Sequence, residues 1–223
     1  MDRRGFLATT GKTIAGLFAA GGVAALVDSG LAEATRPRGR IALTFDDGPG
    51  KGSIAVRQIL EDAGVHGTWF LVGNQVVRGP GIVQGLANNG HGVQNHSWSH
   101  QDLTKLADPR PEITMCSDAI ANAIGRRPQC IRPPYGATND NVRAVIKELG
   151  MSSVFWSLSW QRNTAAANPV LDMILEAEAR RDQGASSTVL FHDVTNDSEW
   201  MIPRLPGLVA AFKALNYEFF TYN

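Results

Sequence analysis

An alternation of strand-like and helix-like segments most constrains what this chain can fold into. Short apolar runs alternate with longer segments whose apolar residues recur at helical spacing, and most of the longer segments end in Gly or Asn. Gly and Asn suit the left-handed position that closes a helix, so the alternation predicts an α/β fold with parallel strands. The strand-like runs are residues 41–45, 67–72, 91–95, 130–133, 152–158, 187–192 and 217–222, and the helix-like segments include residues 53–64, 81–90, 112–125, 141–150, 169–184 and 205–216.

The first strand-like run is not followed by a Gly-rich dinucleotide-binding fingerprint, which weakens a Rossmann fold and favours a barrel. A chain of 223 residues is long enough for one large domain and too short for two comfortable ones. We therefore expect a single barrel domain. In such barrels the chemistry gathers on loops at the carboxyl ends of the strands, so polar residues at strand ends are the first candidates for a site.

The N-terminus has the features of an export signal. Arg3 and Arg4 precede an apolar Ala/Gly stretch over about residues 13–27 and then small residues, and the twin arginine resembles a Tat signal. A membrane anchor or an amphipathic helix is the alternative, but the apolar stretch is shorter than the ~20 residues of a spanning helix. Cleavage would leave no membrane span and place the domain in the periplasm or outside the cell. The expected parts are a signal peptide, residues 1–32, a linker, residues 33–40, and the folded domain, residues 41–223.

The charge balance argues against a nucleic-acid or membrane surface, because 21 basic and 21 acidic residues are spread without a block of like charge. The two cysteines, Cys116 and Cys130, fall early in a helix-like segment and at the start of the next strand-like run. The helix between them would span about 13 Å, beyond the ~7 Å between Cα atoms that a disulfide allows. We therefore expect two free, buried thiols.

Paired acids and paired histidines follow different strand-like runs. Asp46 and Asp47 stand where the first run breaks into Gly-Pro, and His96 and His100 follow the third. On a helical turn the i, i+4 spacing puts both imidazoles on one face, where they can chelate a divalent ion. Each pair alone has a simpler explanation, an Asx turn for the acids and surface or capping roles for the histidines. Together they predict a two-His, one-carboxylate metal site, with the second acid taking a proton from the activated water.

Two further strand ends add candidates. Pro133 and Pro134 offer no N–H, so the backbone N–H of Tyr135 is free of any ladder and suits an oxyanion. Arg132 can hold a neighbouring carboxylate through its fork, and His192 is a candidate general acid for the leaving group. The alternatives are a polyproline turn with a surface arginine, and a satisfied core or capping histidine.

The segments "TFDDGP", "NHSWSH", "RPPYG" and "LFH", in this order, resemble the motifs of the polysaccharide deacetylase family, also called the NodB-homology domain or carbohydrate esterase family 4. The resemblance covers roughly residues 40–222 and is specific as a set. It implies a distorted, TIM-like (β/α) barrel of about seven or eight strands. It also implies metal-dependent removal of acetyl groups from sugars, with Zn²⁺ or another divalent cation such as Co²⁺ as cofactor.

The resemblance implies roles by position. Asp47, His96 and His100 are the implied metal ligands, and Asp46 is the implied general base, positioned by Arg132. The remaining implied roles are oxyanion donation by the backbone N–H of Tyr135, protonation of the departing amine by His192, and substrate contacts by Leu190, which lines the acetyl pocket, and by Pro134.

One family element is missing. After the fifth strand-like run the family usually carries an Asp-x-x-Asp-Trp segment, whose acid helps to orient the arginine, whereas residues 156–164 contain no acid. We expect Ser157, Ser159 or Asn163 to substitute through neutral hydrogen bonds, which are weaker than charge-assisted ones.

The resemblance, with the export signal, implies an exported, metal-dependent N-deacetylase acting on a GlcNAc-containing glycan such as chitin or peptidoglycan. Trp98 and Trp160 are candidates for stacking on sugar rings, with packing as the alternative. An O-acetyl esterase or a small-amide hydrolase of the same fold stays open, as does a carbohydrate-binding protein whose catalysis has lapsed. Asp46 and His192 argue against binding alone, which needs neither a base nor an acid. The expected partners are the acetylated glycan and the Tat export machinery.

Overall fold

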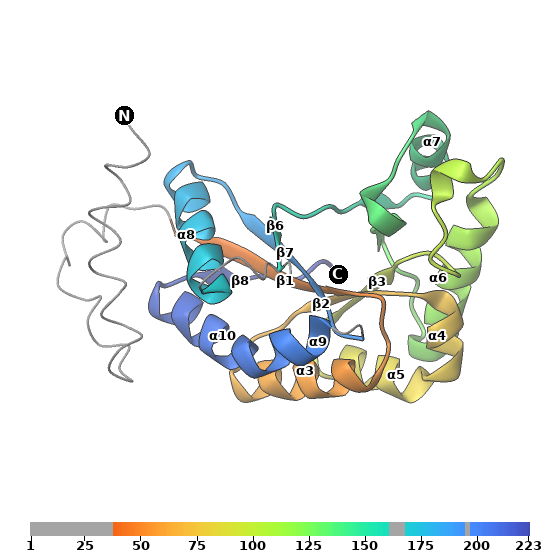
Figure 1. Ribbon diagram of the computed structural model, residues 1–223. Helices are drawn as coiled ribbons and strands as arrows, with labels where there is room; N and C mark the ends of the chain where they lie inside the picture. The colour runs from red at the N-terminus through yellow and green to blue at the C-terminus, as the bar shows by residue number, and fades with distance from the viewer. Residues whose placement is uncertain (1–37, 161–167, 195–196) are drawn as a thin grey trace.

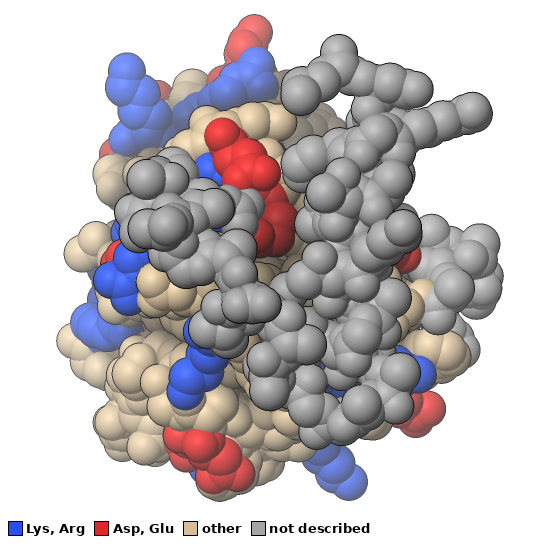
Figure 2. Space-filling model, turned by 90° about the vertical axis from the view of Figure 1, so that its left-hand side faces the viewer, with Lys and Arg blue, Asp and Glu red and all other residues tan. Residues whose placement is uncertain are grey.

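The computed structural model of the chain describes residues 38–160, 168–194 and 197–223 (Figure 1). The expected signal peptide and most of the expected linker lie outside these residues, so both stay predictions. Within the described ranges, no helix combines the length and the apolar character needed to cross a membrane. Acidic and basic side chains are interspersed on the face drawn in Figure 2, as the balanced charge of the chain predicts.

A parallel sheet of eight strands forms the centre of the fold, as the alternating pattern predicts. The strand order is β5-β4-β3-β2-β1-β7-β6, and β8 pairs with β1 at its start. The strands are β1 (Arg40–Asp46), β2 (Thr68–Leu71), β3 (Gly92–Asn95), β4 (Cys130–Ile131), β5 (Ser152–Ser153), β6 (Leu158–Ser159), β7 (Ser187–His192) and β8 (Glu218–Phe219).

Helices flank this sheet. In Figure 1, α3, α5 and α10 lie along one face of the sheet, α4, α6 and α7 stand towards one end, and α8 lies towards the other. Helix α6 is capped by Gly125, whose φ of 75° is the left-handed closure predicted for these segments. The α-helices are α3 (Lys51–Asp62), α4 (Gly73–Arg78), α5 (Pro80–Asn88), α6 (Arg110–Ile124), α7 (Asp140–Glu148), α8 (Pro169–Asp182), α9 (Asp197–Met201) and α10 (Leu205–Ala214), and the 3₁₀ helices are η2 (Leu103–Lys105), η3 (Pro134–Gly136) and η4 (Ile202–Arg204).

The strand-like run 152–158 is not one strand, which corrects the sequence prediction. It contains β5 and the start of β6, which lie at opposite edges of the sheet. Between them, Val154 N–H donates to the Ile131 carbonyl at 2.9 Å, and Ser157 N–H donates to the Thr188 carbonyl at 2.9 Å. The chain thus crosses from one edge to the other without a β5–β6 ladder among the described residues. The sheet is thus a half-barrel that is open between β5 and β6, consistent with the predicted distorted barrel.

The central strand β1 is buried on both faces and separates the core from the site. On one face Phe45 stacks on Trp69 at 4.8 Å and on Phe191 at 5.2 Å between ring centroids. Residues paired in register on parallel strands point to the same face, so the opposite face carries Thr44 beside Leu190 and Asp46 beside His192. The first face packs on helices, and the second is available for chemistry.

Cys116 and Cys130 are both free, as predicted. Cys116 is buried in α6, and burial raises the pKa of its thiol to about 12. Cys130 in β4 is only half-buried, so the prediction that both thiols are buried is wrong for this residue.

Candidate active site

The paired acids lie at the carboxyl ends of the strands, which form one rim of the sheet. Both can face the site at this rim because the chain turns sharply between them. Strand β1 ends at Asp46, and Asp47 has a φ of 73°, a left-handed conformation that Asp tolerates better than most residues. The Asp47 carbonyl accepts a hydrogen bond from Nε2 of Gln75 at 2.8 Å, which holds the turn. As a result, Asp46 Oδ2 lies 3.7 Å and Asp47 Oδ1 lies 3.5 Å from Nε2 of His96.

The histidine pair lies on a loop, so the predicted helical turn is wrong. Ser97 and His100 both have left-handed backbone conformations, with φ of 64° and 62°. Short polar side chains shape the loop: Ser97 N–H donates to Asn95 Oδ1 at 2.7 Å, and His100 N–H donates to Ser97 Oγ at 3.0 Å. Glu112 of α6 accepts from Ser99 N–H at 2.9 Å and ties the loop to the helix layer. The imidazoles meet because the loop folds back on itself.

Three donor atoms converge at this rim. Asp47 Oδ1 lies 3.1 Å from Nε2 of His100 and 3.5 Å from Nε2 of His96, and the three candidate ligand atoms lie within 4.8 Å of one another. Asp47 Oδ1 is buried, yet it has no hydrogen-bond partner among the described residues. Burial raises the pKa of Asp47, but the two imidazoles outweigh it and hold that pKa well below its usual range. A buried carboxylate kept ionised between two imidazole nitrogens is a suitable donor set for a divalent cation.

The tautomer of His96 supports the same interpretation. Its Nδ1 lies 2.6 Å from the Arg132 carbonyl, which can only accept, so the proton of a neutral ring belongs on Nδ1. The lone pair of Nε2 then points towards Asp47 and is free for a metal. Burial lowers the pKa of His96, but the nearby carboxylates of Asp46 and Asp47 outweigh burial and raise it overall. Two imidazoles and one carboxylate match zinc chemistry, with coordination positions left for water and substrate.

The buried side chain of Arg132 holds the second acid. Its Nη1 donates to Asp46 Oδ1 at 2.7 Å and to Thr44 Oγ1 at 2.8 Å, and its Nε donates to the Val154 carbonyl at 3.2 Å. Arg132 is 0 % exposed and Asp46 is 2 % exposed. The two therefore form a charge pair shielded from water, which fixes the direction of the Asp46 carboxylate.

The expected serine substitutes for the missing acid do not contact this arginine. Ser157 bonds to β7 instead, where its Oγ accepts from Thr188 N–H at 2.9 Å, so the prediction for Ser157 is wrong. Ser159 has no hydrogen bond to Arg132 among the described residues, and Asn163 lies outside them. Backbone carbonyls of the crossing segment take the expected place, and a sequence pattern gives no signal for them.

Tyr135 has a left-handed backbone conformation and a backbone N–H without a partner among the described residues. Tyr135 follows the buried Pro134 and has a φ of 61°, and within the described part of the chain no acceptor takes its N–H. Its ring is 68 % exposed and meets the His100 ring edge-on, with 4.8 Å between centroids. A cavity of about 450 Å³ adjoins this ring, lined by Gln101, Asp102, Lys105, Leu106 and Tyr135.

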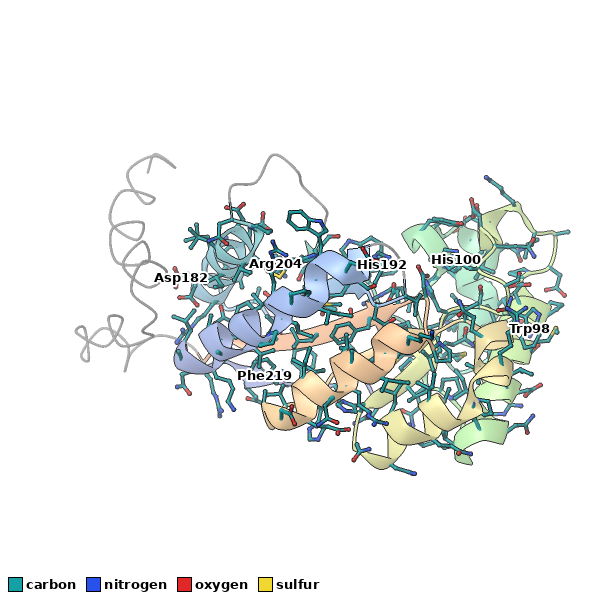
Figure 3. All side chains as sticks on the ribbon, turned by 60° about the horizontal axis from the view of Figure 1, so that its bottom comes forward. Trp98, His100, Asp182, His192, Arg204 and Phe219 are labelled. Carbon is teal, nitrogen blue, oxygen red and sulfur yellow. The ribbon has the colours of Figure 1, made fainter. Side chains whose placement is uncertain are left out.

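Strand β7 brings the last predicted residues to the same face. His192 pairs in register with Asp46 and is half-buried, and Leu190 pairs with Thr44 and is 6 % exposed. In Figure 3 the labelled side chains of His192 and His100 lie at the same end of the sheet, whereas Trp98 lies farther out among the helices.

The two predicted sugar-stacking tryptophans differ in burial. Trp160 is 5 % exposed and packs against Phe191 with 5.9 Å between centroids, so the prediction that it stacks on a sugar is wrong. Trp98 is half-buried and covers Gly73, where a Cβ atom would lie 2.7 Å from the indole. Packing, the alternative, accounts for the position of Trp160, whereas sugar stacking by the half-buried Trp98 stays a prediction.

Sequence reasoning missed a buried acid beside the site. Asp193 Oδ2 accepts a hydrogen bond from Trp69 Nε1 at 2.6 Å, and burial raises the pKa of Asp193 to about 7. Its backbone carbonyl packs against Gly52 in the first turn of α3, where a Cβ atom would lie only 1.6 Å from the carbonyl oxygen. The available signal was an acid immediately after "LFH", at the end of a buried strand.

Comparisons with known proteins give the same grouping. Residues 33–154 match the family model described as "Polysaccharide deacetylase". The chain is 31 % identical over 190 residues to the peptidoglycan-N-acetylglucosamine deacetylase PgdA of Listeria monocytogenes, and this alignment covers 82 % of the chain but 38 % of that protein. It is 30 % identical over 189 residues to a peptidoglycan-N-acetylglucosamine deacetylase of Bacillus cereus, covering 81 % of the chain and 68 % of the relative.

Solved structures similar to this chain include a family 4 carbohydrate esterase from Streptomyces lividans in complex with acetate. It has a TM-score of 0.67 and 31 % identity, with 83 % of this chain and 92 % of that chain covered. The Xyl-CE4 domain of a multidomain xylanase, from the hindgut metagenome of Trinervitermes trinervoides, has a TM-score of 0.70 and 30 % identity, with 82 % and 87 % covered.

Proposed function

The chain belongs to the polysaccharide deacetylase family, and from that membership we propose that it removes N-acetyl groups from a GlcNAc-containing glycan by metal-assisted hydrolysis. The observation that carries the proposal is that the two neighbouring acids have different partners. Asp47 faces the two imidazoles, whereas Asp46 is held apart by Arg132 at 2.7 Å. Ligand and base are thus separate groups, as hydrolysis requires.

In the proposed mechanism Asp47, His96 and His100 hold the cation. A bound Zn²⁺ or similar ion supplies Lewis-acid chemistry, which lowers the pKa of water and polarises a carbonyl. Asp46 accepts the proton from the attacking water, because its second oxygen, Oδ2, faces the site at 3.7 Å from His96 Nε2. Arg132 occupies the first oxygen and so leaves Oδ2 for this task.

The rest of the rim serves the acetyl group and the amine. The N–H of Tyr135 has no acceptor among the described residues, and it donates to the oxyanion that forms on the acetyl carbonyl oxygen when water attacks the carbonyl carbon. His192, beside Asp46 in register, gives a proton to the departing amine. Leu190 contributes an apolar wall for the acetyl methyl group, and the buried Pro134 after β4 is the second proposed apolar contact.

The same family supports a proposal for the substrate class and the location. The curated relatives include peptidoglycan-N-acetylglucosamine deacetylases and a chitin deacetylase from Amylomyces rouxii, so both polymers are candidates. The twin-arginine leader predicted over residues 1–32 would deliver the folded domain to the periplasm or the cell exterior, where such polymers lie. The cavity beside Tyr135 gives space for a neighbouring sugar.

An O-acetyl esterase is the second candidate, because the same metal chemistry serves an ester. Its support is the structural likeness to the family 4 carbohydrate esterase from Streptomyces lividans. A lapsed, sugar-binding protein is less well supported. Burying a charge pair costs desolvation free energy, and binding alone has no use for the Asp46–Arg132 pair.

The test is acetate release by the purified, zinc- or cobalt-loaded protein from chitin oligomers, peptidoglycan and acetylxylan. We expect release from the first two and little from acetylxylan. Release from acetylxylan alone would replace the N-deacetylase proposal with the esterase. No release from any of the three, with metal bound, would favour the sugar-binding protein.

A further inference from the structure

The guanidinium of Arg132 is a buried cation with a single carboxylate partner among the described residues. Besides Asp46, its partners are neutral: the Thr44 hydroxyl and the carbonyls of Val154 and Phe155, the last at 3.4 Å. A divalent cation at the neighbouring ligands would add repulsion. Because a buried cation must be compensated, further stabilisation of this group is needed.

Two aromatic rings supply this further stabilisation of the Arg132 guanidinium. The guanidinium carbon lies 4.2 Å from the centroid of the Phe70 ring and 5.7 Å from that of Trp156, both within cation–π range. Phe70 is fixed in β2, in register with Asp46, and is 0 % exposed. Trp156 is wedged against Gly136, where a Cβ atom would lie 2.9 Å from the indole.

We propose that Phe70 and Trp156 form an aromatic clamp that holds Arg132 in place of the missing acid, and that Trp156 is a positioning residue for the base Asp46. The proposal rests on the proposed function for its effect on the rate. The π faces hold the guanidinium without competing for its N–H donors. Its charge is therefore directed at one carboxylate and is not divided between two.

The position of Trp156 gives the clamp a second consequence. The backbone carbonyl of Arg132 orients His96, and Gly136 follows the predicted oxyanion donor Tyr135. Trp156 touches both segments, so loss of its ring loosens the base and the oxyanion donor together. The clamp acts on the orientation of catalytic groups and not on binding of the glycan. We expect it to change kcat and to leave KM unaltered.

Matched substitutions in the crossing segment test this proposal. Trp156→Phe keeps a ring face, Trp156→Leu keeps apolar bulk alone, and Phe155→Leu is the control, because the Phe155 ring is 44 % exposed and its contact with Arg132 uses the backbone. With the zinc-loaded enzyme, Trp156→Leu should lower kcat about tenfold at unchanged KM and zinc content, whereas Trp156→Phe and Phe155→Leu should stay within about threefold of wild type.

A double-mutant cycle separates the clamp from simple packing. If Trp156 acts through the cation, Trp156→Leu should cost much less unfolding free energy in an Arg132→Gln background than in the wild type. Equal costs in both backgrounds, or a wild-type kcat in Trp156→Leu, would overturn the clamp. If the wild type releases no acetate, the proposed function fails, while the unfolding cycle still decides whether the clamp exists.

Discussion

Replacing Asp46 by Asn is the sharpest test of the different roles proposed for the two adjacent acids, base for Asp46 and metal ligand for Asp47. The amide keeps the size of the side chain and can still accept the 2.7 Å hydrogen bond from Arg132, but it cannot take a proton from water. Loss of a general base lowers kcat by about 10²–10⁴-fold. Because Asp46 is not one of the three proposed ligands and its Oδ2 lies 3.7 Å from His96 Nε2, zinc binding should persist.

The same change has a predictable effect on stability. Arg132 is fully buried, so Asp46→Asn leaves a buried cation facing a neutral amide. Breaking a buried pair outright costs about 3–5 kcal/mol, and the retained hydrogen bond should reduce this to about 2–3 kcal/mol. For a domain of this size that corresponds to a fall in Tm of roughly 4–12 °C.

The assay combines acetate release, zinc content by elemental analysis and thermal unfolding of the loaded protein. Asp47→Asn is the matched control, an identical change one residue away that should lose zinc. An Asp46→Asn variant with more than about a tenth of wild-type kcat would refute the assignment of the base, because a general base contributes at least about 10²-fold. Loss of zinc in that variant would show that Asp46 is a ligand.

Two further predictions concern residues outside the proposed chemistry. Trp160→Ala should cost about 3–5 kcal/mol in the free energy of unfolding, because the ring is a core residue, and should leave KM near wild type; a raised KM at unchanged stability would return Trp160 to the substrate site. The folded-state pKa of Asp193, raised from 3.8 to about 7, means that the folded protein binds a proton that the unfolded chain releases. Stability should therefore decrease as pH rises from about 4 to 7, and Asp193→Asn should flatten this dependence in thermal unfolding; an unchanged slope would contradict the assignment.

The strand ends were the most predictable part of the molecule. Alternating apolar runs gave β1, β3 and β7, and parallel strands present their carboxyl ends at one edge, so Asp47 and His96 could be brought together from the sequence. The predicted barrel was confirmed for the same reason. These features depend on local periodicity and on a general rule of sheet topology.

What escaped prediction depends on contacts between distant segments. The run 152–158 has strand-like composition throughout, and only pairing with β4 at one end and β7 at the other divides it. The partners of Arg132 include backbone carbonyls, which no side-chain pattern reveals. The burial of Trp160 follows from the fit of β6 against Phe191, and the six-residue helix α4 is too short for a periodic pattern.

The most direct test is the metal content of the purified protein and of single ligand variants. If Asp47, His96 and His100 share one ion, the wild type should bind one zinc per chain. Asp47→Asn, His96→Ala and His100→Ala should each lose it, while Asp46→Asn retains it. Full zinc occupancy in His100→Ala and Asp47→Asn, or none in the wild type at saturating zinc, would contradict the account.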